Sequence, residues 1–146
     1  MHQKDDYESN KDGMDLAILN LNKKTGLMKF AGAIRPCYIF RNKKLNLLKG
    51  SRFSIGGFSL SDKIFETQDF QLEKGDMIYL FSDGFPDQFG GGDNKKLKMS
   101  GFHQIMESIV QFPMDQQYKM YSEALNQWMG DNTQMDDILL MAFEYD

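Results

Sequence analysis

Residues 75–91 read Gly-Asp-Met-Ile-Tyr-Leu-Phe-Ser-Asp-Gly-Phe-Pro-Asp-Gln-Phe-Gly-Gly, and this stretch decides much of the fold. The apolar run from Met77 to Phe81 is typical of a buried β-strand. Residues 82–94 are rich in glycine and contain a proline, which predicts a long irregular loop. Asp83 directly follows the strand and Asp87 comes shortly after it, so carboxylates stand at the mouth of this loop.

The region before this stretch predicts a series of short strands. Apolar runs alternate with turn-forming residues, and the connections are too short to hold crossover helices. The expected strands cover residues 15–21, 27–33, 37–40, 45–48 and 65–72, with a loop over residues 50–62. The first half of the chain is therefore expected to form an antiparallel meander.

The region after the glycine-rich loop predicts two helices and a closing strand. Apolar residues recur at helical spacing from Phe102 to Val110 and again from Tyr118 to Trp128. Ser100 is the expected N-cap of the first helix, and Gly130 is the expected stop of the second. Residues 138–145 complete the pattern as a final strand. Strands, then helices, then one more strand favour an α+β fold with antiparallel β-sheets.

Length and composition exclude several classes of protein. The 146 residues suit one compact domain, and aromatic side chains make up 13% of them, enough for a sizeable core. The net charge of −4 and the lack of a long basic run argue against a nucleic-acid partner. No apolar run approaches the roughly 20 residues that span a bilayer, so no direct membrane contact is expected. Cys37, the single cysteine, favours a reducing cytoplasm and a place in the core.

Four carboxylates lie at the ends of expected strands. Asp83 and Asp87 follow the strand that ends at Phe81, while Asp136 and Asp137 precede the closing strand. Oxygen ligands held at strand ends suit hard divalent cations such as Mg²⁺ and Mn²⁺. Aspartate also caps turns at strand ends, and the residues by themselves leave this structural alternative open.

The sequence offers no nucleophile system that works without a metal. His2 lies in a polar tail, His103 is expected on a helix surface, and no Ser-His-Asp or Cys-His set can be assigned. Residues 90–92 are glycines without the Gly-Lys-Ser/Thr of a phosphate-binding loop. No catalytic side chain is therefore assigned, and any phosphate chemistry requires a metal.

Four segments occur in an order that resembles a known family. They are Asp12–Ala17, Phe30–Ala33, residues 75–91 and Gln134–Ile138. Together they resemble the C-terminal half of a SpoIIE-like PPM-type (protein phosphatase 2C-like) serine/threonine phosphatase domain, over nearly all of residues 12–145. The resemblance implies part of an α-β-β-α sandwich of two antiparallel sheets with helices outside, and residues 1–11 are then interpreted as a disordered tail or a remnant.

The resemblance also implies a two-metal site for Mn²⁺ or Mg²⁺ that hydrolyses phosphoserine or phosphothreonine. By motif match, Asp83 and Asp136 resemble ligands of one core metal, and Asp87 resembles a ligand of an additional, weaker metal. Asp137 is a further candidate, and Gly84 is expected to permit the sharp turn after Asp83. The implied role is the output domain of a bacterial signalling protein, which is cytoplasmic or tethered to a membrane by another part of the protein.

The chain departs from the family pattern in two places. It has no Asp-x-Thr-Gly-His-Gly segment, which in the family bridges both metals, so the site is expected to be incomplete and this chain inactive alone. Ile34-Arg35 replaces more usual Asn-rich residues. The implied partner is a phosphorylated regulatory protein of the anti-anti-sigma type, and uncovered strand edges favour a homodimer. The alternatives are a pseudophosphatase that binds a partner without catalysis, and a plain structural domain.

Overall fold

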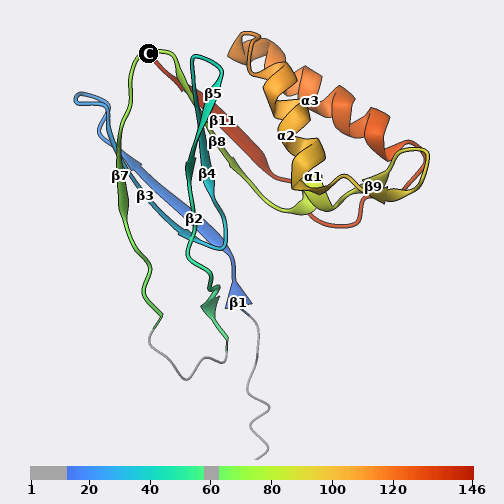
Figure 1. Ribbon diagram of the computed structural model, residues 1–146, viewed down its shortest axis with the longest axis horizontal. Coiled ribbons are helices and arrows are strands. Elements are labelled where there is room, and N and C mark those ends of the chain that lie inside the picture. Colours follow the sequence, from blue (N-terminus) through green and yellow to red (C-terminus); the bar gives the residue numbers. More distant parts are fainter. Residues whose placement is uncertain (1–12, 58–62) are drawn as a thin grey trace, which may run out of the picture.

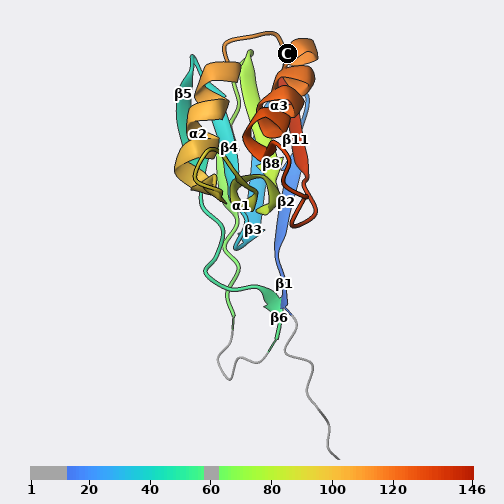
Figure 2. The same cartoon turned by 90° about the vertical axis from the view of Figure 1, so that its right-hand side faces the viewer.

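The protein is built from three layers: a three-stranded sheet, a four-stranded sheet and a pair of helices (Figure 1). The computed structural model describes residues 13–57 and 63–146. The interpretation of residues 1–11 as a tail, and Asp12 of the first family segment, lie outside the described residues. Figure 2 looks onto the helical layer, which covers one face of the four-stranded sheet. This arrangement confirms the α+β class with antiparallel sheets and two late helices.

The strands and helices have the following bounds. The three-stranded sheet has the order β2-β3-β7 and contains β2 (Leu16–Leu21), β3 (Leu27–Ala33) and β7 (Gln68–Gln71). The four-stranded sheet has the order β11-β8-β4-β5 and contains β4 (Cys37–Arg41), β5 (Lys44–Leu48), β8 (Asp76–Phe81) and β11 (Leu140–Tyr145). Two short pairs join β1 (Gly13–Met14) to β6 (Ile55–Gly56) and β9 (Phe89–Gly90) to β10 (Lys95–Lys96). The helices are α1 (Gly84–Asp87), α2 (Lys98–Ile109) and α3 (Met114–Met129).

Strand β4 shows how one sheet feeds two cores. Successive side chains of a strand point to opposite faces. Cys37 and Ile39 therefore enter the core between the two sheets, while Tyr38 and Phe40 enter the core under the helices. All four side chains are buried, which explains why the strand is a continuous apolar run rather than an alternating one. Burial raises the pKa of the Cys37 thiol to about 12.

The meander predicted for the first half of the chain is wrong. The β2–β3 and β4–β5 hairpins form as expected, but β4 pairs with β8 and β3 pairs with β7. The chain changes sheet between β3 and β4, at Ile34 and Arg35. Strand periodicity identifies a strand but not its non-neighbouring partner, so the sequence did not reveal this change of sheet.

The helices begin and end close to the expected residues, with one correction. Helix α2 starts at Lys98 after Leu97, which makes no side-chain cap, so Ser100 lies inside the helix and the N-cap prediction is wrong. Gly130 ends α3 with a φ of 55°, as expected for a glycine stop. His103 is half-buried against the Tyr38 ring, with the ring centroids 5.0 Å apart, and not on an open surface. Within residues 13–57 and 63–146, no helix has the length and apolarity to cross a membrane.

Candidate functional site

The pairing of β8 with β11 brings two of the predicted acidic segments together. Phe81 lies opposite Leu140, so the residues after β8 run beside those before β11. The Ser82 hydroxyl donates to the Asp137 carbonyl at 2.8 Å and accepts from the Leu139 amide at 2.9 Å. Asp83 is therefore held next to the Asp136–Asp137 turn by backbone pairing and by one hydroxyl.

Gly84 is required by this close approach. A Cβ atom at Gly84 would overlap the carbonyl oxygen of Asp137. Gly84 does not have a positive φ, and it begins the short helix α1. The expected reason for this glycine, a sharp turn after Asp83, is therefore replaced by the contact with Asp137.

Arg35 joins two carboxylates from separate parts of the chain. Its Nη2 lies 2.6 Å from Asp15 Oδ2 and 2.7 Å from Asp83 Oδ2. The other oxygen of Asp15 accepts a hydrogen bond from the Ser54 hydroxyl. The exposed fraction of the side chain is 19% for Arg35, 27% for Asp15 and 45% for Asp83. Asp83 is thus the most accessible member of the cluster.

The charge of Arg35 is stabilised by these carboxylates. Burial alone lowers the pKa of the guanidinium, but the hydrogen bonds and charges of Asp83 and Asp15 outweigh it, and the net pKa is raised. Arg35 therefore stays cationic and offsets the repulsion between two acidic side chains. Neither Arg35 nor Asp15 was predicted as a site residue, because each pairing partner is remote in sequence.

The other predicted ligands lie around this cluster. Asp87 ends helix α1, and its Oδ2 lies 2.9 Å from Lys96 Nζ. Asp136 is exposed; its Oδ1 accepts from the Asp137 amide at 2.7 Å, and its carbonyl accepts from the Gln134 side chain. In the described part of the chain, no group of three or more His, Cys, Asp or Glu is arranged to hold a metal ion. A joint metal site of Asp83, Asp87 and Asp136 stays a prediction.

Gln88 is a buried residue that ties the two acidic segments together. Its Nε2 donates to the Thr133 carbonyl at 2.9 Å, and its Oε1 accepts from the Met135 amide at 3.3 Å. Its own carbonyl accepts from the Trp128 indole at 2.9 Å. Gln88 follows Asp87 directly and anchors the residues that precede Asp136. Sequence reasoning missed this role, since a Gln in a glycine-rich loop carries no signal of burial.

A groove of about 440 Å³ opens beside Asp83. Asp83 and Asp87 line it together with the basic residues Arg35 and Lys49. Apolar side chains, among them Ile34, form most of the remaining wall. The groove thus combines acidic side chains that suit a hard cation with basic side chains that suit an anion.

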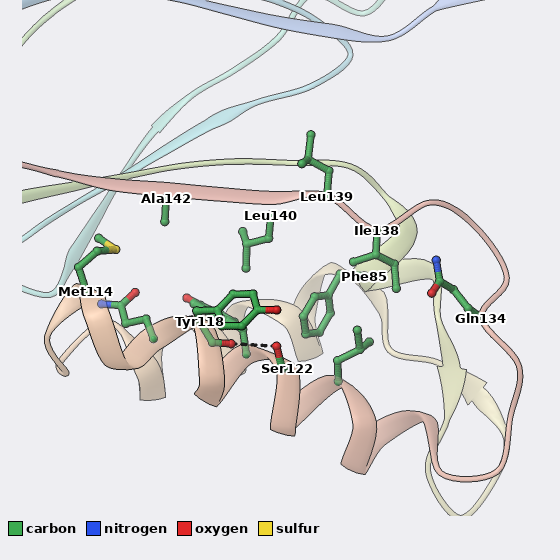
Figure 3. A pocket seen from close by; sticks show the side chains of 12 residues that line it. Phe85, Met114, Tyr118, Ser122, Gln134, Ile138, Leu139, Leu140 and Ala142 are labelled. Carbon is green, nitrogen blue, oxygen red and sulfur yellow. Dashed lines mark hydrogen bonds between the residues drawn. The ribbon is translucent and has the colours of Figure 1, made fainter.

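A second hollow of about 520 Å³ lies between α3 and β11 (Figure 3). Tyr118 and Leu140 form part of its wall, and none of the described residues that line it is charged. The hydrogen bond from Ser122 to the Tyr118 carbonyl, 3.0 Å, only closes a turn of the helix. This hollow lacks the groups for metal or phosphate chemistry, so the groove beside Asp83 is the candidate site.

Comparisons with known proteins identify the family and the fold of the chain. The family model described as "Stage II sporulation protein E (SpoIIE)" matches residues 3–146. The solved SiaA-PP2C domain of Pseudomonas aeruginosa is 27% identical with a TM-score of 0.81, and the alignment covers 90% of this chain and 51% of that one. A search of curated proteins finds no match.

Two further solved structures show the same fold at lower identity. The Mn-presoaked phosphatase domain of SpoIIE from Bacillus subtilis is 15% identical with a TM-score of 0.64, over 90% of this chain and 56% of that one. The RsbU and RsbW domains of Rv1364c from Mycobacterium tuberculosis are 18% identical with a TM-score of 0.68, over 89% of this chain and 35% of that one. The chain thus spans about half the length of the SiaA and SpoIIE domains, and less of the two-domain structure.

Proposed function

Because the chain belongs to the SpoIIE family of PPM-type phosphatase domains, we propose that it forms part of a metal-dependent protein serine/threonine phosphatase. The observation that carries this proposal is the position of Asp83 beside the Asp136–Asp137 turn, at the mouth of a groove. Asp83 and Asp87 line this groove, and the segment of Asp136 and Asp137 runs directly beside Ser82. Carboxylates gathered in this way are the kind of ligands that phosphate hydrolysis with a divalent cation requires.

The acidic side chains are of the right type for the metals of this family. We propose Asp83 and Asp136 as ligands of one Mn²⁺ or Mg²⁺, Asp87 as a ligand of a weaker ion, and Asp137 as an additional candidate. Carboxylate oxygens are the ligands that these hard cations prefer. In the structure, Arg35 Nη2 lies beside Asp83, so a divalent cation at Asp83 would have to displace this contact.

Bound Mn²⁺ or Mg²⁺ would supply a water of lowered pKa and neutralise the charge that develops on the phosphate. The role of the protein's own residues is to hold and orient the segments that carry these carboxylates. Ser82 and Gly84 keep Asp83 in contact with the backbone of Asp137, and Gln88 fixes the residues before Asp136. The groove admits a phosphorylated side chain between basic groups and an apolar wall.

We propose that this chain supplies only part of the metal site. It spans about half of the solved SiaA domain, and the ligands that it lacks would come from a part of the natural protein outside this chain. Little hydrolysis is therefore expected from this chain alone. The proposed substrate is a phosphoserine or phosphothreonine of a cytoplasmic regulatory protein of the anti-anti-sigma type, in a bacterial signalling pathway.

A homodimer is a separate proposal, which rests on strand β11. This strand forms one edge of the four-stranded sheet, and the apolar hollow of Figure 3 lies beside it. An edge strand next to an apolar surface favours pairing with another chain. Sedimentation that shows a monomer at micromolar concentration would argue against this dimer.

The alternative function is a pseudophosphatase that binds a partner without catalysis. Two pairings favour it, because Asp83 and Asp87 are each occupied by a basic side chain, Arg35 and Lys96. In this alternative the pairs are permanent and no divalent cation displaces them. Metal binding therefore separates the two functions.

The test is Mn²⁺ binding to the chain, followed by electron paramagnetic resonance. For the phosphatase, Asp83→Asn and Asp136→Asn should each weaken Mn²⁺ binding about tenfold or more, since each removes a charged ligand. Asp93→Asn is the control, because Asp93 is exposed and, among the residues that the structure describes, pairs with Lys95 alone. Equal Mn²⁺ binding by all four proteins would contradict the proposed function.

A further inference from the structure

We propose that Arg35 binds the phosphate of the substrate, and that Asp15 holds its guanidinium in place while it does so. This inference rests on the proposed function, since it assigns the anion-binding residue of the same groove. It rests on four observations: the unused donors of Arg35, the difference between its two carboxylate partners, the fixed backbone at this residue, and the charges of the groove.

The first observation is that Arg35 uses only one of its three nitrogens. Both of its hydrogen bonds, to Asp15 and to Asp83, come from Nη2. Within the described residues, its Nε and Nη1 donate to no acceptor. A guanidinium carries five N–H donors in a planar fork that matches two oxygens of a phosphate. Arg35 therefore has an unused donor edge, and it lines the groove.

The second observation is that the two partners of Arg35 differ. Asp15 is the less exposed carboxylate and is itself held by the Ser54 hydroxyl. Asp83 is about half exposed and is the proposed metal ligand. When Asp83 turns its lone pairs to a divalent cation, Arg35 loses one acceptor and keeps the other. Asp15 is thus the anchor, and Asp83 is the partner that a phosphate replaces.

The third observation is the unusual backbone at Arg35. Ile34 has a φ of 64°, which β-branched residues rarely adopt, and the Arg35 amide donates to the Ala33 carbonyl at 2.7 Å. A Cβ atom at Gly32 or at Gly50 would overlap the carbonyl oxygen of Arg35. The chain therefore accepts a strained turn and two close contacts at this residue. Strain of this kind clusters where a side chain must be held for a function.

The fourth observation is the charge of the groove. Asp83 and Asp87 would repel a phosphate dianion if nothing opposed them. Arg35 and Lys49 are the basic side chains that line the same groove. Lys49 is exposed, whereas Arg35 is largely buried and fixed by Asp15. Arg35 is therefore the better preorganised of the two cations for a phosphate.

A test that needs no metal uses Asp83→Asn. This substitution removes the competing carboxylate charge but leaves Arg35 on Asp15, so inorganic phosphate should bind about fivefold to tenfold more tightly than to the unaltered chain in EDTA. The double variant Asp83→Asn, Arg35→Gln should lose this gain. The readout is phosphate titration followed by NMR amide shifts, which also report that each variant is folded.

Two control variants test whether the gain depends on the Arg35 guanidinium itself. Arg52→Gln in the Asp83→Asn background removes an exposed arginine outside this groove and should keep the gain. Arg35→Lys should keep part of it, because a lysine retains the charge but not the fork. If the Asp83→Asn chain binds phosphate no better than the unaltered chain, or if removal of Arg35 leaves the gain intact, the role of Arg35 is wrong.

The same variants separate this inference from the proposed function. Arg35→Gln alone should bind Mn²⁺ as tightly as the unaltered chain or more tightly, since it removes a cation from Asp83. A chain that binds no Mn²⁺ but gains phosphate affinity through Asp83→Asn would contradict the proposed function and support the role of Arg35. A chain that binds Mn²⁺ through Asp83, but whose phosphate binding does not depend on Arg35, would support the proposed function and contradict the role of Arg35.

Discussion

Strands β4 and β8 lie side by side, and each end of this pair carries an arginine and a buried or half-buried aspartate. At one end Arg41 binds both carboxylate oxygens of Asp76: Nε donates to Oδ1 at 2.8 Å and Nη2 donates to Oδ2 at 2.6 Å. At the other end Arg35 reaches Asp83 through a single nitrogen. The two ends contain the same chemical groups, but they use them differently.

The Arg41 end is closed. Arg41 also donates to Glu73 and to the Gln71 carbonyl, so all three of its nitrogens have acceptors. The Asp76 side chain is only 1% exposed. The hydrogen bonds and charge of Asp76 are the main cause of the raised Arg41 pKa. An ion pair in which every arginine nitrogen has an acceptor stabilises the fold. At the other end, Arg35 has unused N–H donors and Asp83 is partly exposed, so both can bind ligands.

The largest expected difference between the two ends is in stability. Asp76→Asn should lower the free energy of unfolding by about 3 kcal/mol, because it leaves Arg41 without its buried counter-charge. Asp83→Asn should change it by less than about 1 kcal/mol, since this carboxylate is half exposed. Urea denaturation of both variants measures the difference. Equal losses would mean that the Arg35 end is also a structural clamp.

The next effect concerns the close contact at the open end. Gly84→Ala should cost about 2 kcal/mol, because its Cβ meets the Asp137 carbonyl and the backbones must separate. Gly92→Ala is the matched control, since no atom of residues 13–57 or 63–146 lies within 4 Å of a Cβ at that position. The midpoint temperature of thermal unfolding and the affinity for Mn²⁺ should both fall for Gly84→Ala but not for Gly92→Ala. A Gly84→Ala variant as stable as Gly92→Ala would contradict this role of Gly84.

A smaller effect should follow when lysine replaces each arginine. Arg41→Lys should cost about 1.5 kcal/mol, because a lysine cannot serve the four acceptors of that end. Arg35→Lys should cost less than about 0.5 kcal/mol, since only one nitrogen is used. Denaturation should use urea and not guanidinium chloride, because a salt would screen these ion pairs. The reverse order would place the structural clamp at Arg35.

The smallest expected effect is a gain. Ile34→Asn should raise the free energy of unfolding by about 1 kcal/mol, because asparagine tolerates the positive φ that isoleucine resists. Leu47→Asn is the control, since Leu47 lines the same groove, is exposed to a similar degree and has no positive φ. Chemical denaturation should show a gain for Ile34→Asn only. A loss at Ile34 would mean that its side chain contributes more by packing than its backbone costs.

The sequence predicts most of the strands and helices, because their signals are local. The Asn42–Lys43 turn between β4 and β5, with both residues at positive φ, and the glycine stop of α3 follow from neighbouring residues. The change of sheet at Ile34 does not, since pairing of β4 with β8 depends on residues far along the chain. Asp76 shows the same limit, because its place next to Gly75 is typical of a turn, whereas the structure shows a buried ion pair with Arg41, which is remote in sequence.

The acidic half of the candidate site follows from the sequence, but the basic half does not. Asp83 and Asp87 line the groove, and both follow closely on the apolar run of residues 77–81, which is a local signal in the sequence. Arg35 acquires its role only when β3 and β4 fold into different sheets and bring Asp15 and Asp83 to one guanidinium. No spacing rule links these three residues, so only the three-dimensional structure reveals the cluster.

Because Cys37 is buried between the two sheets, its reactivity can report transient opening of the structure. A thiol reagent in water reaches that sulfur only after the layers part, and no other thiol competes for it. The labelling rate under native conditions then reports how often the sandwich opens. A ligand that strengthens the Arg35 end should slow that rate, which allows occupancy to be followed without measuring turnover.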